Sequence, residues 1–143
     1  MTITSGAGTY LQTALLNVLG GSTFPAVPAH FYLALFTTAP TNGAAGTEVT
    51  TAAAPTYARL SITPNTTNFP AATSAAGVST VANGVNTIMA AMGNGSGIAI
   101  VGWGLYDAAT AGNMWFYGPT TSTTLAATDT AEFIAGNLTF TAQ

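Results

Sequence analysis

The sequence predicts a mainly β protein, a β-sandwich or jelly-roll-like barrel with one short N-terminal α-helix. Three observations predict it: short apolar and aromatic runs recur along the chain, turn-forming Gly, Pro and Asn residues separate them, and one stretch alone has clear helical periodicity. The 143 residues suit a single domain, 1–143. Within it we expect the helix at 5–19 and a β-rich body at 22–143.

The helix is predicted from an apolar stripe near the N-terminus. Apolar residues recur there three or four positions apart, which places them on one face of a helix. The stripe consists of Tyr10, Leu11, Ala14, Leu15, Val18 and Leu19. We expect Ser5 to cap the helix. Gly20-Gly21 should end it, because glycine readily adopts the left-handed conformation found at helix C-termini.

Short strands are predicted for most of the body. They are expected at 30–37, 57–62, 98–106, 114–117, 131–134 and 138–141. Turns at 107–113 and 135–137 join the last four strands into two hairpins. The first strand alternates only loosely between apolar and polar residues, so we expect both of its faces to be covered.

The segments between these strands are less regular. Residues 39–54 are predicted to be a loop, because Pro, Asn and Gly punctuate them. Residues 77–97 fit either short strands or a weak helix. Within that segment, Asn83-Gly84 favours a turn between strands, and 93–97 is a glycine-rich loop.

Charged residues are unusually scarce. They make up 3% of the chain, against roughly a quarter in ordinary domains. One arginine cannot neutralise a row of phosphates, so we expect no nucleic-acid partner. No apolar run approaches the ~18 residues of a membrane span, so no membrane partner is expected. The chain lacks cysteine, which excludes disulfides and thiolate metal ligands. Its nearly neutral surface favours packing against other chains.

The remaining ionisable residues give little support for an enzyme. Hydrolysis or group transfer needs an acid or nucleophile, a base and an electrostatic stabiliser held together. His30 stands alone beside an apolar strand, where a hydrogen-bonded structural histidine is expected. Asp129 and Glu132 could form a catalytic carboxylate pair or a calcium site, but no sugar platform or dense acidic loop accompanies them. We therefore predict no enzymatic activity, no cofactor and no bound metal.

Arg59 is the only permanent cation among four carboxylates. We expect it to form one specific ion pair, either within the chain or across a subunit contact. An ordinary surface arginine is the alternative. We therefore count Arg59 as a candidate interface residue, together with the apolar helix positions. Those positions are Leu11, Leu15, Val18 and Leu19.

Several motifs occur together in an order that resembles a known family. They are Phe31-Tyr32-Leu33-Ala34-Leu35-Phe36-Thr37-Thr38-Ala39-Pro40, Tyr57-Ala58-Arg59 and Asp107-Ala108-Ala109-Thr110. With the flanking segments they resemble small virion proteins of tailed phages, labelled tail-fibre-like or capsid decoration proteins. The resemblance covers nearly the whole chain. It implies a protein made in the host cytoplasm and built into the virion, with no catalytic residues.

Two structural roles follow from this resemblance. We expect a capsid decoration, or cement, protein that binds the major capsid protein and stabilises neighbouring capsomers. The alternative is a tail-fibre, tail-tip or baseplate component that works with other tail proteins and contacts the host surface. Four aromatic residues are expected to fill the core of the hairpin; in the alternative role they could instead stack on sugars. These are Trp103, Tyr106, Trp115 and Tyr117.

A homo-oligomer is expected in either role. A monomer of this composition would expose much uncharged, apolar surface, and such patches usually mark contacts. Phage surface proteins occupy symmetric positions, for which closed symmetry is the usual solution. We predict a trimer at capsid three-fold or quasi-three-fold positions, an inference from lattice geometry and from the resemblance. The helix stripe and the loop at 39–54 are expected to contribute to its contacts.

Overall fold

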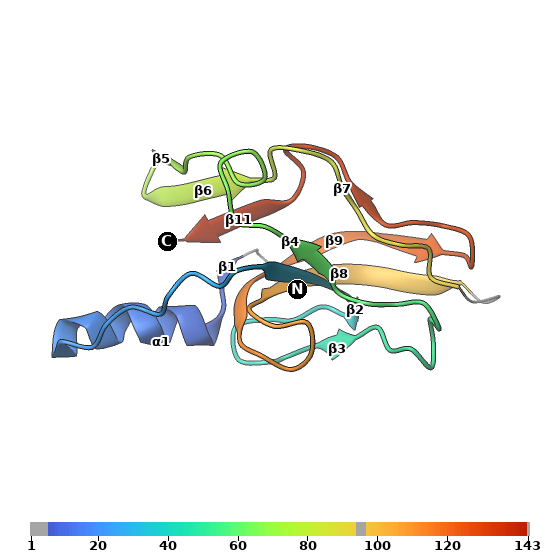
Figure 1. Ribbon diagram of the computed structural model, residues 1–143, viewed down its shortest axis with the longest axis horizontal. Coiled ribbons are helices and arrows are strands. Elements are labelled where there is room, and N and C mark those ends of the chain that lie inside the picture. Colours follow the sequence, from blue (N-terminus) through green and yellow to red (C-terminus); the bar gives the residue numbers. More distant parts are fainter. Residues whose placement is uncertain (1–5, 94–96, 143) are drawn as a thin grey trace.

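The computed structural model describes residues 6–93 and 97–142 (Figure 1). Its elements are β1 (Gly6–Ala7), α1 (Thr9–Asn17), the 3₁₀ turn η1 (Val18–Gly20), β2 (Phe31–Thr38), β3 (Thr47–Glu48), β4 (Leu60–Ile62), β5 (Thr73–Ala75), β6 (Val78–Ala82), β7 (Thr87–Ile88), β8 (Ile98–Tyr106), β9 (Met114–Leu125), β10 (Glu132–Phe133) and β11 (Thr139–Ala142). The middle of the predicted glycine-rich loop, 94–96, lies outside the described residues.

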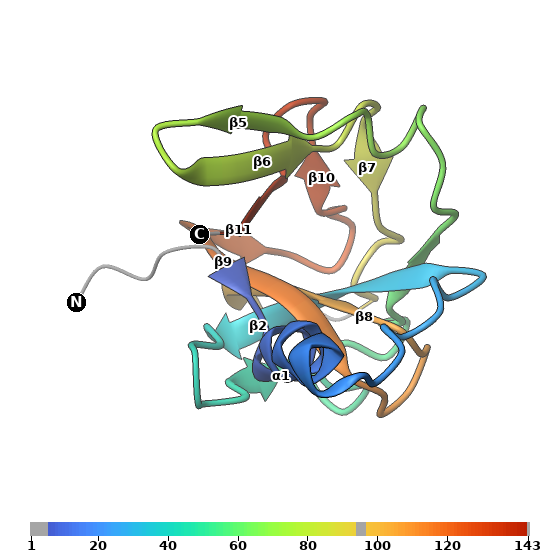
Figure 2. The ribbon, with the colours of Figure 1, turned by 90° about the vertical axis from the view of Figure 1, so that its left-hand side faces the viewer.

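The strands form two layers. A six-stranded antiparallel sheet has the order β1-β9-β8-β2-β3, with β4 also paired to β2. A three-stranded sheet, β11-β6-β5, and the pair β10-β7 lie over one of its faces (Figures 1 and 2). The predicted mainly β fold is confirmed. Of the two predicted architectures, the layered arrangement is that of the β-sandwich.

Strand β2 is covered on both faces, as its loose alternation predicts. Four consecutive residues, Leu33 to Phe36, are at most 1% exposed. Leu33 and Leu35 belong to the main core between the layers, whereas Ala34 and Phe36 pack on the opposite face with Tyr106. A strand that is buried on both faces has no position for a polar side chain. This explains the continuous apolar run.

Two glycines of β8 make room on this second face. The register places Ala34 opposite Gly104 and Phe36 opposite Gly102. A Cβ atom at Gly104 would lie 3.1 Å from both the Phe36 and Tyr106 rings, and one at Gly102 would lie 2.8 Å from the Cβ of Ala39. Packing therefore explains why glycine, which weakens a strand interior, recurs in this central strand.

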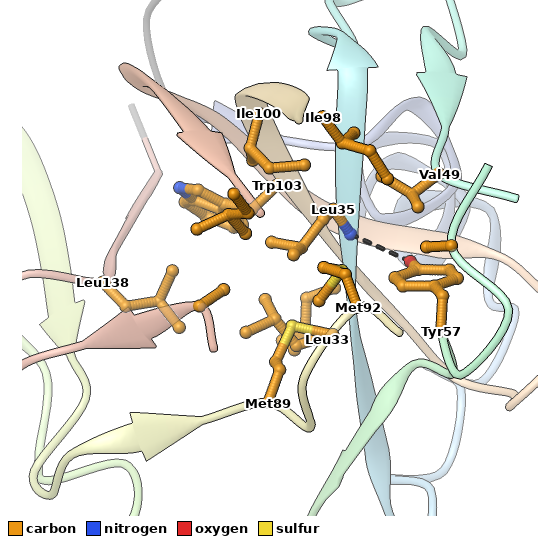
Figure 3. Packing of buried hydrophobic residues seen from close by; sticks show 14 of the residues in the cluster. Leu33, Leu35, Val49, Tyr57, Met89, Met92, Ile98, Ile100, Trp103 and Leu138 are labelled. Carbon is orange, nitrogen blue, oxygen red and sulfur yellow. Dashed lines mark hydrogen bonds between the residues drawn. The ribbon is translucent and has the colours of Figure 1, made fainter. Parts of the chain in front are cut away.

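The main core fills the space between the layers (Figure 3). Trp103 of the large sheet packs edge-on against Phe140 of β11, with 5.1 Å between ring centroids. Leu138, Met89 and Met92 close the core from segments beside the smaller sheets, and each is at most 2% exposed. Burying one such side chain contributes about 1.5–3 kcal/mol. This cluster is therefore what holds the small sheets on the large one.

The N-terminal helix is shorter than predicted. Residues 6–7 are a strand paired with β9, and the helix begins at Thr9 with Gly8 as its N-cap, so the predicted cap at Ser5 is wrong. Ser5 itself lies outside the described residues. Gly8 is buried, and its N–H donates to the carbonyl of Trp115 at 2.7 Å, which ties this segment to the sheet. The predicted end is confirmed: Gly21 is left-handed, with φ 83°.

The other predicted strands differ in length and pairing. The hairpin of β8 and β9 is confirmed, but β9 continues to Leu125 through a Thr-rich stretch that lacks alternation. The strand predicted at 57–62 shrinks to β4, and the predicted loop at 39–54 contains β3. Residues 77–97 contain strands, one of which pairs with β5 through an unpredicted turn at Ala76-Gly77.

The predicted hairpin of the last two strands is wrong. Strand β10 pairs with β7 and β11 pairs with β6, so the turn at 135–137 crosses between sheets. The side chain of Asn83, 3% exposed, binds the backbone on both sides of this crossing. Its Oδ1 accepts the N–H of Leu138 at 2.9 Å, and its Nδ2 donates to the carbonyl of Phe133 at 3.1 Å. Asn83-Gly84 likewise joins strands of different sheets, not a hairpin.

Replacing Asn83 tests this role. Asn83→Ala should lower the free energy of unfolding by about 3 kcal/mol, because it leaves buried backbone groups unpaired. Urea denaturation measures the change. Asn137→Ala, an exposed asparagine in the adjoining turn, is the control and should stay within about 0.5 kcal/mol of wild type. Equal losses in the two variants would contradict the assignment.

Candidate assembly surface

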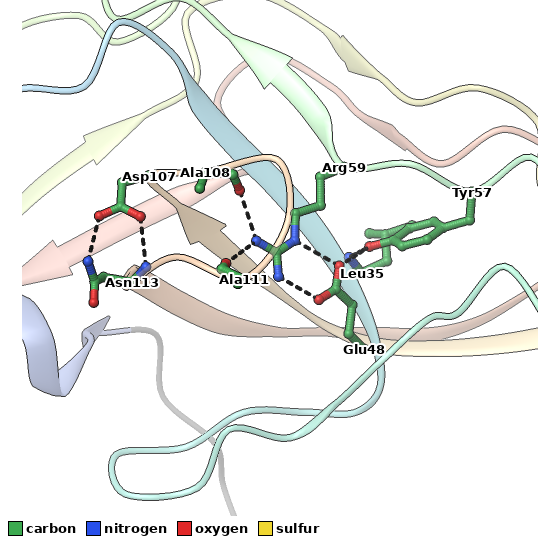
Figure 4. Close-up of polar contacts among 8 residues, drawn as sticks. All are labelled: Leu35, Glu48, Tyr57, Arg59, Asp107, Ala108, Ala111 and Asn113. Atoms are coloured by element: carbon green, nitrogen blue, oxygen red, sulfur yellow. Dashed lines mark hydrogen bonds and ion pairs between the residues drawn. The ribbon is translucent and has the colours of Figure 1, made fainter.

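Arg59 is the centre of a polar network inside the chain (Figure 4). It precedes β4, and its guanidinium binds the Glu48 carboxylate through two hydrogen bonds, Nε to Oε1 at 2.9 Å and a second nitrogen to Oε2 at 2.7 Å. Its remaining terminal nitrogen donates to the carbonyls of Ala108 and Ala111 at 2.9 and 2.7 Å. The guanidinium also lies over the Tyr106 ring, 3.7 Å from its centroid. Only 8% of the Arg59 side chain is exposed.

Tyr57 connects this network to the central strand. Its hydroxyl donates to Oε1 of Glu48 at 2.9 Å and accepts the N–H of Leu35 at 3.0 Å. Burial raises the pKa of Tyr57, and the nearby Glu48 charge raises it further. Burial alone would lower the pKa of Arg59, but its hydrogen bonds and charge interaction with Glu48 outweigh this and raise it. Tyr57 therefore stays a neutral donor and Arg59 a fixed cation.

The turn at 107–113 is held from both sides. Ala111 has a left-handed φ of 53°, a conformation that costs a non-glycine residue roughly 1–2 kcal/mol, and Arg59 holds its carbonyl. On the other side, Asp107 accepts the backbone and side-chain N–H groups of Asn113 at 2.7 and 2.9 Å. Burial acts to raise the pKa of Asp107, but the hydrogen bonds from Asn113 and Trp115 lower it overall.

Of the alternatives predicted for Arg59, the structure shows the ion pair within the chain. The pair joins segments that are 11 residues apart, and the two carbonyl contacts reach 49 and 52 residues further along the chain. Most of its donors are used internally. A role for Arg59 in a subunit contact stays a prediction.

The N-terminal segment forms an exposed arm, defined here as residues 8–30. It contains α1 and the chain that returns beside it to β2. Helix α1 lies beside β9, and its outer end projects past the large sheet (Figure 1). No residue of α1 is buried. Of the predicted interface residues, Leu11 is half-buried, while Leu15, Val18 and Leu19 are 63%, 44% and 88% exposed.

The arm exposes three further apolar residues that the stripe did not include. They are Leu16, Phe24 and Val27. Leu16 was not part of the predicted stripe, and Phe24 and Val27 lie beyond the helix, where each directly precedes a proline. Composition was the sequence signal that could have identified this wider apolar surface, because the whole segment between Thr9 and Ala29 lacks a charged residue.

Trp115 anchors the base of the arm. Tyr10 from the first turn of α1 and Phe24 from the returning chain pack on its ring, with centroids 5.9 and 6.2 Å away. Trp115 and the three other aromatic residues that could have formed a sugar platform are at most 9% exposed. The expectation that they are core residues is confirmed, and the alternative of an exposed stacking surface on these four residues is wrong.

The candidate catalytic residues do not converge. His30 is exposed, and its Nδ1 lies 3.4 Å from the Thr63 hydroxyl. Asp129 accepts the N–H of Ala126, while Glu132 accepts the side-chain amide of Asn86. Across residues 6–93 and 97–142, no three His, Asp or Glu side chains form a group that could hold a metal ion. Over the same ranges, no helix has the length and hydropathy needed to cross a membrane.

The cation lies in an internal network, and six of the nine large apolar side chains exposed among the described residues lie on the arm, which favours packing against other chains. The sequence comparison identifies the family: residues 6–141 match the family model described as podophage GP4 fiber I protein gp80. The chain belongs to this family. The predicted resemblance to tailed-phage virion proteins is thereby confirmed, and the chain is a virion structural protein. No curated protein matches the chain.

Breaking the central ion pair gives a direct test of the network. Arg59→Met should lower the free energy of unfolding by about 3 kcal/mol, the lower end of the cost of breaking a buried pair, because Glu48 is 27% exposed and partly solvated. The stability of Arg59→Lys should lie between those of Arg59→Met and the wild type. An ammonium group keeps the charge, but it cannot bind both carboxylate oxygens and both carbonyls in this geometry. Chemical denaturation of the purified chain measures both.

A double-mutant cycle provides the control. Glu48→Gln with Arg59→Met removes the stranded charge, so the double variant should lose less than the sum of the single losses. Additive losses, or an Arg59→Met variant as stable as wild type, would show that the pair does not stabilise the fold.

Proposed function

We propose that the chain is a non-enzymatic structural component of a virion fibre. The observation that carries this proposal is the match of residues 6–141 to a family whose description names a fibre protein. The structure supports it through an internally braced β-sandwich and an apolar arm that is free to contact another chain. The partners on this proposal are other tail proteins and further copies of the chain.

We propose a homo-oligomer, with a trimer as the expected state. The apolar residues of the arm, Leu15, Val18 and Leu19 among them, are its contact surface. Exposed apolar patches of this kind on a soluble domain usually mark protein contacts. A closed ring leaves no arm without a partner, which is why symmetric oligomers are the common solution.

Capsid decoration is the second candidate function. The observation that favours it is the compact body: the 143 residues contain no repeated shaft motif. A cement protein would use its neutral faces to pack on the major capsid protein and stabilise neighbouring capsomers. The family description favours the fibre over this alternative.

Labelling of whole particles separates the two functions. Antibodies raised against the purified chain and coupled to gold should bind at the tail of the virion in electron micrographs. Label spread evenly over the shell would instead support capsid decoration. Denatured particles should also be tested with the same antibody. If intact particles carry no label and the denatured particles contain no detectable chain, any virion role is contradicted.

An activity assay tests the non-enzymatic part of the proposal. The purified chain should leave host-surface polysaccharide and peptidoglycan uncleaved, because the described His, Asp and Glu side chains do not converge. Product release is followed by chromatography over a long incubation. Turnover that disappears in His30→Ala or Asp129→Asn would contradict the proposal.

A further inference from the structure

The exposed apolar residues of the chain are concentrated on the arm. Of the nine large hydrophobic side chains that are exposed among the described residues, six lie between positions 15 and 27. They are Leu15, Leu16, Val18, Leu19, Phe24 and Val27. Helix α1 has nine residues, whereas an isolated helix shorter than about 12–15 residues is marginal in water. The outer part of the arm therefore needs a partner for its apolar face.

A second unpartnered apolar surface lies on the body. A groove of about 450 Å³ opens beside β2, β6, β9 and β11, and we call it the phenylalanine groove. Its walls are Phe31, Phe69, Phe116 and Phe140, with Leu105 and Val81. The polar side chains are few, and the Asn65 Oδ1 already accepts the N–H groups of Thr67 and Asn68. The groove therefore suits an aliphatic occupant.

The arm and the groove match in chemistry. All five charged residues lie outside both surfaces. Docking the arm in the groove therefore buries no unpaired charge, which would be strongly unfavourable. Every copy carries both surfaces in equal number, so a second copy supplies the complement without any other protein.

We propose that the arm of one copy docks its exposed leucines in the phenylalanine groove of a second copy. This deepens the assembly role proposed above and rests on it. Trp115 fixes the base of the arm. Leu15 and Leu16 line a separate hollow beside β9 and β11, with Tyr117 and Ala142, and no residue of the arm lines the phenylalanine groove of its own chain. Trp115 also packs on Phe31, a wall of the groove, with centroids 5.3 Å apart.

The contact joins two different surfaces, so it is heterologous. A heterologous contact closes into a ring when it is repeated around one axis, and the expected trimer is a ring of this kind. Because the base of each arm adjoins its own groove through Trp115, every docked arm lies beside the origin of the next one. Aromatic contacts of Trp115 with Phe24 and Phe31 make this connection.

The lack of cysteine allows a direct experiment. Leu19→Cys and Thr66→Cys change an exposed arm residue and an exposed residue lining the groove. The two purified variants are mixed under mild oxidation, and disulfide-linked dimers are resolved on a non-reducing gel. The expected result is a mixed disulfide at least ten times more abundant than in the control. The control pairs Ile134→Cys, which is 56% exposed away from the arm, with Thr66→Cys.

Other outcomes overturn the proposal. Dimers of Leu19→Cys with itself as the main product would show arms packing on arms. Equal yields in the test and control mixtures, or a monomeric mass for the wild-type chain by light scattering, would show that no specific docking occurs. A monomeric chain whose antibody still labels the tail would overturn this contact and leave the proposed function intact.

A groove-filling variant tests the same contact without cysteine. Ala72→Trp places a large side chain from an exposed position on the groove lining, and Leu15→Ser with Leu19→Ser removes the apolar arm surface. Both changes should shift the chain from oligomer to monomer. Ile134→Ser, a change at an exposed residue outside the arm, is the control, and the urea midpoints of the monomeric variants should stay near its midpoint. Oligomers that survive both changes would overturn the proposal.

Discussion

Strand β2 is buried on both faces, and the rest of the structure depends on this constraint. One face, with Leu33 and Leu35, packs in the main core and is covered by the smaller sheets. The other face, with Ala34 and Phe36, has no sheet above it. It is closed by the Tyr106 ring, over which the guanidinium of Arg59 lies. Without both covers, a continuous apolar strand would contact water.

The single cation is therefore used for architecture. Arg59 and Glu48 join β3, the segment before β4 and the turn at 107–113, and Tyr57 extends the network to the backbone of β2 at Leu35. A buried ion pair is weak evidence of net stability, because both charges lose their hydration. Its directional hydrogen bonds instead select one arrangement of these loops. In a chain with few charges, that arrangement has no competing ion pairs.

The same scarcity of charge shapes the exterior. A virion structural protein must contact other chains over wide areas, and surfaces without charge avoid desolvation penalties when they meet. The fold separates two tasks: the polar network stays inside the body, and the apolar residues that remain exposed gather on the arm. Membership in a family whose description names a phage fibre protein agrees with this separation of a braced body from an apolar arm. The arm carries six of the nine large apolar side chains that are exposed among the described residues.

Local patterns predicted the elements that depend only on neighbouring residues. The periodicity and turn chemistry of the sequence determined β2, the hairpin at 98–117, the helix end at Gly21, and the apolar positions Leu15 and Leu19. Tertiary structure alone decided that β10 and β11 pair in different sheets, that Glu48 is the partner of Arg59, and that the helix is left exposed. The physical reason is distance along the chain: Asn83 meets a backbone group 55 residues away, and such contacts form only when the layers stack.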